Sequence, residues 1–256
     1  MNIKCIKESP CSIKLLYVLV IISLLLNICC LSMKCCKKDS AKRDQAIATW
    51  IDNNAEAILN SVNKYVTKQQ AEAQKQQQAK AEENIKKFDK ELKDTKYAGV
   101  INPKGTAVIV EFFDYNCGYC KIASKNVNEL LKQRKDVKVV LRAIPILGEA
   151  SVYATQVGEA ILIADASKYV TYYETLMNGS ARSKEEVAKA VEKAGLKMDR
   201  ISKILEKNKQ EIQNAMDINT NLARQIGING TPAFIINGNL IPGAVDAEAL
   251  NSMLSK

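Results

Sequence analysis

The sequence contains no histidine among its 256 residues. This absence excludes acid-base catalysis by histidine and every metal site that needs a histidine ligand. Cysteine is also scarce in the body of the chain: six of the eight cysteines lie within the first 36 residues, and only Cys117 and Cys120 follow them. A fold stapled by several disulfides is therefore excluded for the body, which must be held together by its hydrophobic core.

The chain has little excess of positive charge outside its beginning. Residues 1–44 contain eight Lys or Arg and three Asp or Glu, which accounts for +5 of the formal net charge of +9. The remaining +4 is spread over more than two hundred residues, without a basic stripe interleaved with aromatic residues. We therefore expect no nucleic-acid partner.

Residues 15–33 are nearly all apolar, and three lysines precede them. A basic segment followed by an apolar run is the layout of an export signal. No A-x-A-like cleavage site follows, and the run has about the ~20 residues that a membrane-spanning helix needs. Residues 1–33 are thus a signal peptide or an uncleaved signal anchor. Basic residues after the run favour keeping that side inside, whereas the cysteine chemistry described below favours export.

Residues 41–96 contain neither proline nor glycine. Apolar residues recur at helical spacing in the first part of this stretch, which predicts an amphipathic helix, and the second part is rich in Gln, Ala, Lys and Glu. We interpret residues 34–97 as a helical segment with two alternative roles. It is either a solvated spacer or, through residues 41–92, a stalk for homo-oligomerisation.

Two apolar segments, residues 106–113 and 137–144, are typical of strands buried on both faces of a sheet. A helical pattern lies between them, so the three segments predict a strand-helix-strand unit with parallel strands. Consecutive helical patterns fill residues 149–226. We therefore expect an α/β fold with a helical insertion.

The end of the chain predicts a hairpin and a last helix. The dipeptide Asn237-Gly238 follows an apolar run and precedes a second one, which is a strong hairpin signal. Asp246 has the position and the side chain of a helix cap. Together with the preceding elements, these features place one α/β domain over residues 98–256.

The pair Cys117 and Cys120 forms a Cys-x-x-Cys motif directly after a buried strand and at the start of a helix. A zinc site would need two more ligands, and the body contains no further cysteine and no histidine. A thiolate at a helix N-terminus faces unpaired backbone N–H groups, which stabilise its charge. This placement predicts a redox pair in which Cys117 attacks and Cys120 resolves.

The two residues between the cysteines, Gly118 and Tyr119, modulate this pair. Neither side chain is cationic at neutral pH, so neither stabilises a thiolate strongly. We infer a reduction potential that is less oxidising than the extreme of the known range, which runs from ~−270 to ~−120 mV.

Two further positions have side chains suited to the same chemistry. Glu111 lies on the strand, on the same face as Ile109 and Phe113, so burial should raise its pKa and make it a proton acceptor for the resolving thiol. The alternative is a glutamate that only completes the core.

Pro232 follows Gly230-Thr231 and enters an apolar strand, a setting in which proline is often cis. Such a turn would leave the Thr231 backbone free to pair with an extended substrate.

The segment from Phe112 to Lys121, with Glu111 before it and Gly230 to Phe234 near the end, resembles the DsbA family of bacterial thiol:disulfide oxidoreductases, which have a thioredoxin fold. This resemblance implies that Cys117 is the nucleophile, Cys120 the resolving cysteine, Glu111 the buried acid and Pro232 the cis-proline after Thr231. The N-terminal helical stretch is similar to the arm of the ScsC-like and outer-membrane-antigen branch, where it can drive oligomerisation.

The resemblance also implies a setting. We expect a periplasmic protein, exported by its N-terminal segment and either released or anchored in the inner membrane. Its expected partners are cysteine-containing exported proteins and a redox partner that resets the cysteine pair. No metal and no organic cofactor are expected.

The chain departs from the family's founding oxidase, which has Pro and His between its cysteines and Val before the cis-proline. Gly118-Tyr119 and Thr231 are more similar to the disulfide isomerase DsbC. The expected function is disulfide exchange that supports disulfide bond formation, with an oligomeric isomerase or reductase as the alternative. A third hypothesis is a membrane-anchored structural protein with a vestigial redox site.

Overall fold

A computed structural model describes residues 10–255, with side chains described for residues 17–30 and 40–255. The first nine residues of the expected signal or anchor lie outside this range. The chain divides into two compact units, residues 1–72 and residues 73–256. Among the described residues, no helix is apolar over enough of its length to cross a membrane.

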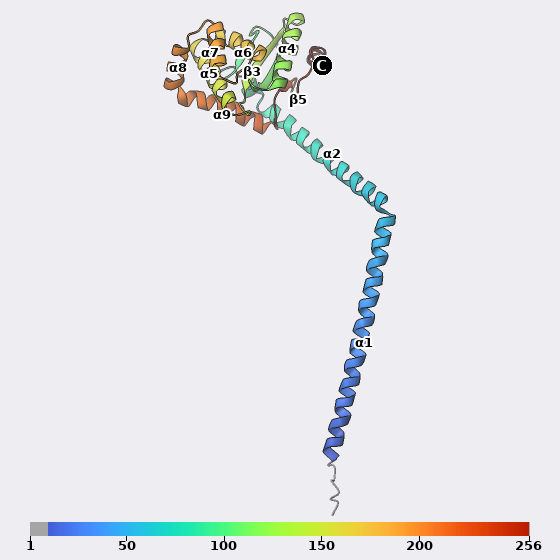
Figure 1. Cartoon of the computed structure of the whole chain (residues 1–256). Coiled ribbons are helices and arrows are strands. Elements are labelled where there is room, and N and C mark those ends of the chain that lie inside the picture. Colours follow the sequence, from blue (N-terminus) through green and yellow to red (C-terminus); the bar gives the residue numbers. More distant parts are fainter. Residues whose placement is uncertain (1–9, 256) are drawn as a thin grey trace, which may run out of the picture. The chain divides into compact units, whose positions relative to one another are not determined.

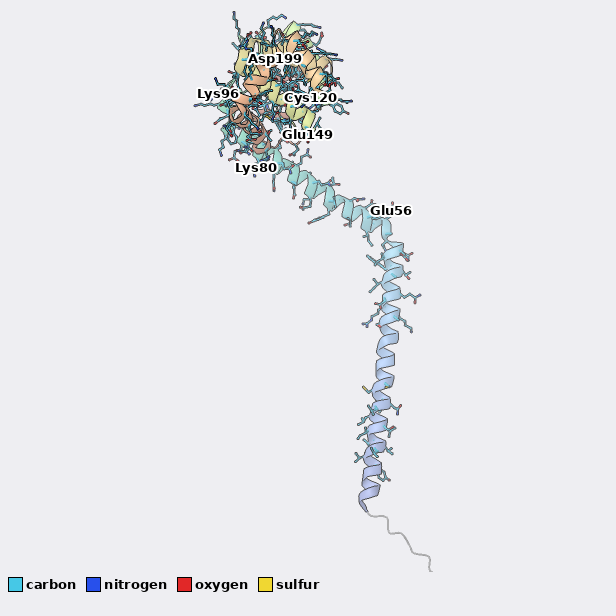
Figure 2. The ribbon with its side chains drawn as sticks, turned by 60° about the vertical axis from the view of Figure 1, so that its left-hand side comes forward. Glu56, Lys80, Lys96, Cys120, Glu149 and Asp199 are labelled. Atoms are coloured by element: carbon cyan, nitrogen blue, oxygen red, sulfur yellow. The ribbon has the colours of Figure 1, made fainter. Side chains whose placement is uncertain are left out.

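The first unit is helical. Helix α1 spans Pro10–Asn53, and helix α2 spans Ala55–Lys87 and extends into the second unit. The single helix expected over this stretch is interrupted at Asn54, whose side-chain amide donates a hydrogen bond of 2.7 Å to the Trp50 carbonyl. Figure 2 shows the side chains around Glu56 extending from the helix with nothing packed on them.

The second unit contains a five-stranded sheet in the order β1-β3-β2-β4-β5. β2 (Ala107–Phe113) pairs in parallel with β3 (Val137–Ala143), as the strand-helix-strand pattern predicts, and antiparallel with β4 (Ala233–Ile236). Strand β5 (Asn239–Pro242) forms the expected hairpin with β4. Strand β1 (Gly99–Ile101) was not expected, because three residues are too few to show a periodic pattern.

Helices cover the sheet on both faces. Helix α4 (Gly118–Gln133) connects β2 to β3, and α10 (Ala247–Leu254) packs against α4. The Asp246 side chain caps α10 by accepting a hydrogen bond of 2.8 Å from the Ala249 N–H group. The short helix α3 (Asp89–Lys93) lies next to β2.

The expected helical insertion between β3 and β4 consists of α5 (Glu149–Asp165), the 3₁₀ helix η1 (Ala166–Lys168), α6 (Tyr169–Asn178), α7 (Lys184–Lys193), α8 (Met198–Lys207) and α9 (Lys209–Gln225). Figure 1 shows α5, α7 and α8 grouped together, away from the C-terminus. Helix α5 ends at Asp165, whose carboxylate accepts hydrogen bonds from the Ser167 N–H and hydroxyl groups.

The two faces of β2 belong to different hydrophobic clusters. Ile109 and Phe113 lie in the larger cluster, together with both cysteines of the motif. Val110 and Phe112 lie in the smaller one, which includes Ile85 of α2. A strand buried on both faces is thereby confirmed, and the end of α2 is part of the core of the second unit.

Arg142 attaches the segment before β1 to the sheet. Its side chain is buried, and its guanidinium group donates hydrogen bonds to the carbonyls of Leu92 at 3.1 Å and Asp94 at 2.7 Å, and to that of Glu91. It also donates to the Asn219 side chain at 2.7 Å. Burial lowers the pKa of Arg142 to about 10, so the side chain remains charged at neutral pH.

Replacement of this side chain should cost much of the domain's stability. We expect Arg142→Leu to lower the free energy of unfolding by about 3 kcal/mol, because three backbone carbonyls, of which that of Leu92 is buried, and the Asn219 amide oxygen lose their charged donor. Denaturant unfolding of the full chain measures this. Arg134→Leu is the control, since Arg134 pairs with Asp136 at the surface, and equal losses in the two variants would contradict this account.

Candidate active site

Cys117 is the N-cap residue of α4 and follows the loop that leaves β2. Its backbone is extended, and its N–H group donates a hydrogen bond of 3.1 Å to the Asp114 carbonyl. The helix begins at Gly118, so the Cys117 side chain lies beside N–H groups that have no partner within the helix. The structure therefore has the helix start that the sequence predicted at the motif.

The two cysteines differ in their access to solvent. Cys117 is 8% exposed and Cys120 is fully buried, at 0%. Both are free cysteines in this structure, and Figure 2 locates Cys120 within the densely packed second unit. Burial raises the pKa of the Cys120 thiol, and a hydrogen bond with the Asp114 backbone lowers this pKa in part. A thiolate on Cys120 is therefore unfavourable. An incoming sulfur can reach Cys117 but not Cys120.

Thr231 and Pro232 lie beside the cysteine pair, although they follow it by more than a hundred residues. The Thr231–Pro232 peptide bond is cis. The Cys117 thiol donates a hydrogen bond of 3.2 Å to the Thr231 carbonyl. The loop before β4 thus brings a backbone acceptor to the more accessible sulfur.

Gly118 and Tyr119 form the outer side of the motif. A side chain added at Gly118 would meet no atom within 4 Å, and Tyr119 is 68% exposed. Neither residue brings a charge near the cysteines.

Glu111 is fully buried on β2, on the face that also carries Ile109 and Phe113. Its cross-strand neighbours, Leu141 and Phe234, are apolar. Burial raises the pKa of Glu111 to about 8, and a hydrogen bond from Tyr173 lowers it in part. The carboxyl group is therefore mainly protonated at neutral pH.

The Asp114 side chain positions the loop between β2 and α4, a role that the sequence did not lead us to predict. The carboxylate accepts hydrogen bonds from the Ser151 hydroxyl at 2.6 Å and from the N–H group of Asn116 at 2.8 Å. It also accepts from the N–H groups of Ile146 and Leu147, at 2.9 and 3.0 Å. An acidic residue directly after a buried strand was the available signal, but its partners come from a loop and a helix that the sequence does not place.

Within residues 17–30 and 40–255, no group of three or more His, Cys, Asp or Glu side chains could hold a metal ion. The groups gathered around the motif are the two sulfurs, the Glu111 carboxyl group and the Thr231 carbonyl.

The fold and the site together define the class: a thioredoxin-fold protein with a Cys-x-x-Cys pair at a helix N-terminus. A family model described as thioredoxin matches residues 102–256. The chain belongs to this family, and its structure is similar to those of DsbA-like proteins.

Curated relatives include the Na⁺/H⁺ antiporter NhaA 1 of Salinispora arenicola, which is 29% identical over 150 residues. The match covers 57% of this chain and 22% of the antiporter, so the chain spans about a fifth of that relative's length. The probable disulfide bond formation protein D of Bacillus anthracis is 22% identical over 160 residues, covering 58% of this chain and 74% of that protein.

Two solved structures extend the likeness. The thiol-disulfide exchange protein α-DsbA2 of Wolbachia pipientis is 25% identical, with a TM-score of 0.64, and the match covers 68% of this chain and 94% of that one. Proteus mirabilis ScsC in a compact conformation is 26% identical, with a TM-score of 0.59, and the match covers 77% of this chain and 94% of that one.

The raised pKa of Glu111 predicts how the free energy of unfolding depends on pH. The folded pKa of about 8 lies above the unfolded value, so the folded state binds this proton more tightly, and wild-type stability should fall as pH rises from about 4.5 to about 8. Glu111→Gln removes this dependence. The variant should gain stability relative to the wild type across that window, on the order of a few kcal/mol.

Urea unfolding of both proteins at pH 5 and pH 8 measures this difference. Asp136→Asn is the control, because Asp136 lies at the surface and its pKa is lowered to about 2 by Arg134, outside the window. If the stabilities of wild type and Glu111→Gln change in parallel with pH, the buried carboxyl group is not the source of the effect.

Proposed function

We propose that this chain is a protein thiol:disulfide oxidoreductase that exchanges a Cys117–Cys120 disulfide with cysteines of exported proteins. The observation that carries the proposal is the asymmetry of the pair: one sulfur at a helix N-terminus with 8% exposure, and the other fully buried. The names of the Wolbachia and Bacillus proteins described above support the same chemistry.

The proposed reaction begins with the oxidised pair. A substrate thiolate attacks the Cys117 sulfur, the Cys117–Cys120 bond breaks, and Cys120 leaves as a thiolate that takes up a proton. The second substrate thiol, once deprotonated, attacks the substrate sulfur of the mixed disulfide and releases Cys117. The substrate loses two electrons and gains a disulfide, while the cysteine pair is reduced to two thiols.

Several residues have roles in this proposal. Cys117 is the catalytic nucleophile, Cys120 the resolving cysteine, and Glu111 the proton donor and acceptor for Cys120. Thr231 and Pro232 present the backbone beside Cys117 to an extended substrate. The exposed pair Gly118 and Tyr119 modulates the reduction potential.

The proposed setting is the periplasm, reached through the N-terminal segment. A separate redox partner must reoxidise the pair after each turnover, because the reaction leaves both cysteines reduced. The proposal involves no metal and no organic cofactor, since the sulfurs themselves accept and release the electrons.

The direction of exchange depends on the reduction potential of the pair. A value near ~−120 mV would make the protein a donor of disulfides, whereas a value near ~−200 mV or lower suits an isomerase or reductase. The absence of a cationic side chain at positions 118 and 119 favours the lower range, because nothing there stabilises the reduced thiolate strongly.

A trapping experiment tests the exchange reaction. We expect Cys120→Ser to accumulate a mixed disulfide at Cys117 when the full chain is mixed with oxidised glutathione, because the resolving thiol is missing. Cys117→Ser is the matched control and should form no adduct at the buried Cys120. Peptide mapping by mass spectrometry distinguishes these sites from the six N-terminal cysteines. Absence of an adduct at Cys117 would favour the vestigial-site hypothesis.

A second candidate function is an oligomeric isomerase or reductase, and the exposed side chains of the helical segment favour it. Large apolar side chains on α1 and the first part of α2 lie in solvent: Ile47, Trp50, Ile51, Leu59, Val62, Tyr65 and Val66. A helix seldom leaves so many apolar side chains exposed unless another helix covers them. Several copies joined in this way would present several cysteine pairs to one substrate.

We expect Trp50→Glu combined with Val62→Glu to shift the full chain from oligomer to monomer, because two charges would be buried in the contact. Sedimentation velocity or light scattering measures the mass. Gln69→Glu is the control, since it adds a charge to α2, the helix of Val62, without removing an apolar side chain. A wild-type chain that is monomeric at all concentrations would contradict this role for residues 41–92.

A further inference from the structure

The carboxyl group of Glu111 has a polar neighbour that the proposed mechanism has not used. The Tyr173 hydroxyl donates a hydrogen bond of 3.5 Å to Oε2 of Glu111. The other oxygen, Oε1, is buried without a hydrogen-bond partner. Among the described residues, Tyr173 is thus the group that holds this carboxyl group in place.

Tyr173 bonds to Glu111 and lies on the helix that packs against the one carrying the resolving cysteine. It is a residue of α6, which packs against α4, the helix that carries Cys120. Its ring meets that of Phe113 edge to face, with centroids 5.0 Å apart. Its hydroxyl group interacts electrostatically with Glu111 and with Cys120, and shares a hydrogen bond with Ser124, one turn beyond Cys120 on α4.

The other titratable groups near Glu111 leave Tyr173 as the connecting group. The strand neighbours from β3 and β4 are Leu141 and Phe234, which do not titrate. Tyr169 of α6 also interacts electrostatically with Glu111, but its hydroxyl accepts a hydrogen bond from Tyr115 at 2.9 Å. Cys120 itself comes from α4. Among the described residues, burial and Tyr173 are the causes of the shifted pKa of Glu111, and no lysine or arginine is one.

We propose that Tyr173 is a positioning residue, whose hydroxyl group links the proton of Glu111 to the sulfur of Cys120. This inference rests on the proposed disulfide exchange and assigns a role to a residue outside the Cys-x-x-Cys motif. The hydroxyl fixes one carboxyl oxygen and is both a donor and an acceptor in a core where Glu111 and Cys120 are buried from solvent.

The proton transfer is balanced within the first step of the reaction. As the substrate thiolate bonds to Cys117, the electron pair of the broken disulfide goes to the Cys120 sulfur. The Tyr173 hydroxyl passes a proton towards that sulfur and receives one from Glu111, so the tyrosine is unchanged. Cys120 ends as a thiol and Glu111 as a carboxylate, which later regains a proton from solvent.

Tyr173→Phe tests the link, because it removes one oxygen and keeps the ring. We expect the rate of reduction of the Cys117–Cys120 disulfide by dithiothreitol to fall about tenfold at pH 7. The pH midpoint of that rate should also move upward, since Glu111 loses the hydrogen bond that lowers its pKa. Quenched alkylation and peptide mapping follow the two cysteines in the full chain.

Tyr172→Phe is the matched control. Its hydroxyl donates to the Ala154 carbonyl at 2.7 Å, so its loss disturbs the neighbouring core without touching Glu111. This variant should retain the wild-type pH profile. The double variant Glu111→Gln with Tyr173→Phe should be no slower than Glu111→Gln alone, because both changes interrupt one path. An unchanged profile in Tyr173→Phe, or additive losses in the double variant, would overturn the proposal.

An infrared measurement separates this inference from the proposed function. The C=O stretch of protonated Glu111, assigned by its loss in Glu111→Gln, should shift to higher frequency and persist to higher pH in Tyr173→Phe. This readout needs no exchange activity. A band that does not change overturns the Tyr173 link, whereas a shifted band with no disulfide exchange by the wild type overturns the proposed function alone.

Discussion

The Asp114 carboxylate is the interaction on which the geometry of the site depends. It accepts four hydrogen bonds from groups on both sides of the site, including the backbone of the loop before α5 and the hydroxyl of Ser151. These bonds join the end of β2 to the helical insertion. The chain must therefore turn into α4 at Cys117, which places the sulfur at the helix N-terminus.

Burial of ionisable groups determines the chemistry that the site can perform. Cys120 and Glu111 are both fully buried, and desolvation raises the pKa of each. A thiolate formed at Cys120 therefore needs a proton, and a protonated carboxyl group lies on the same side of the sheet. Because the chain contains no histidine, no imidazole can carry a proton at neutral pH. The carboxyl group is therefore more important as a proton donor and acceptor.

The two units depend on different forces. The second has a continuous core and a buried arginine that attaches the segment before β1 to the sheet. The first has long helices on which the large apolar side chains of residues 17–28 and 47–66 are mostly exposed to solvent. Such helices gain little from propensity alone, so the proposed association of several copies would provide the packing that they lack. The same association would connect the stalk to the function of the domain.

Local pattern in the sequence determined much of the fold. The apolar strands, the parallel pairing of β2 with β3, the hairpin at Asn237-Gly238 and the helix start at Cys117 all follow from neighbours a few residues apart. The short strand β1 and the interruption at Asn54 could not be predicted in this way, because neither has a sequence pattern long enough to detect.

Only the tertiary structure decided which distant residues meet. The Thr231 carbonyl, the Asp114 partners and the Tyr173 hydroxyl come from loops and helices far along the chain. Their contacts arise where the loop after β3, the helices α5 and α6 and the loop before β4 meet the end of β2 and the start of α4, an arrangement that no local period encodes. The sequence by itself thus determined the Cys-x-x-Cys pair at a helix start and the burial of Glu111, while the packing decided which backbone and side-chain groups surround them.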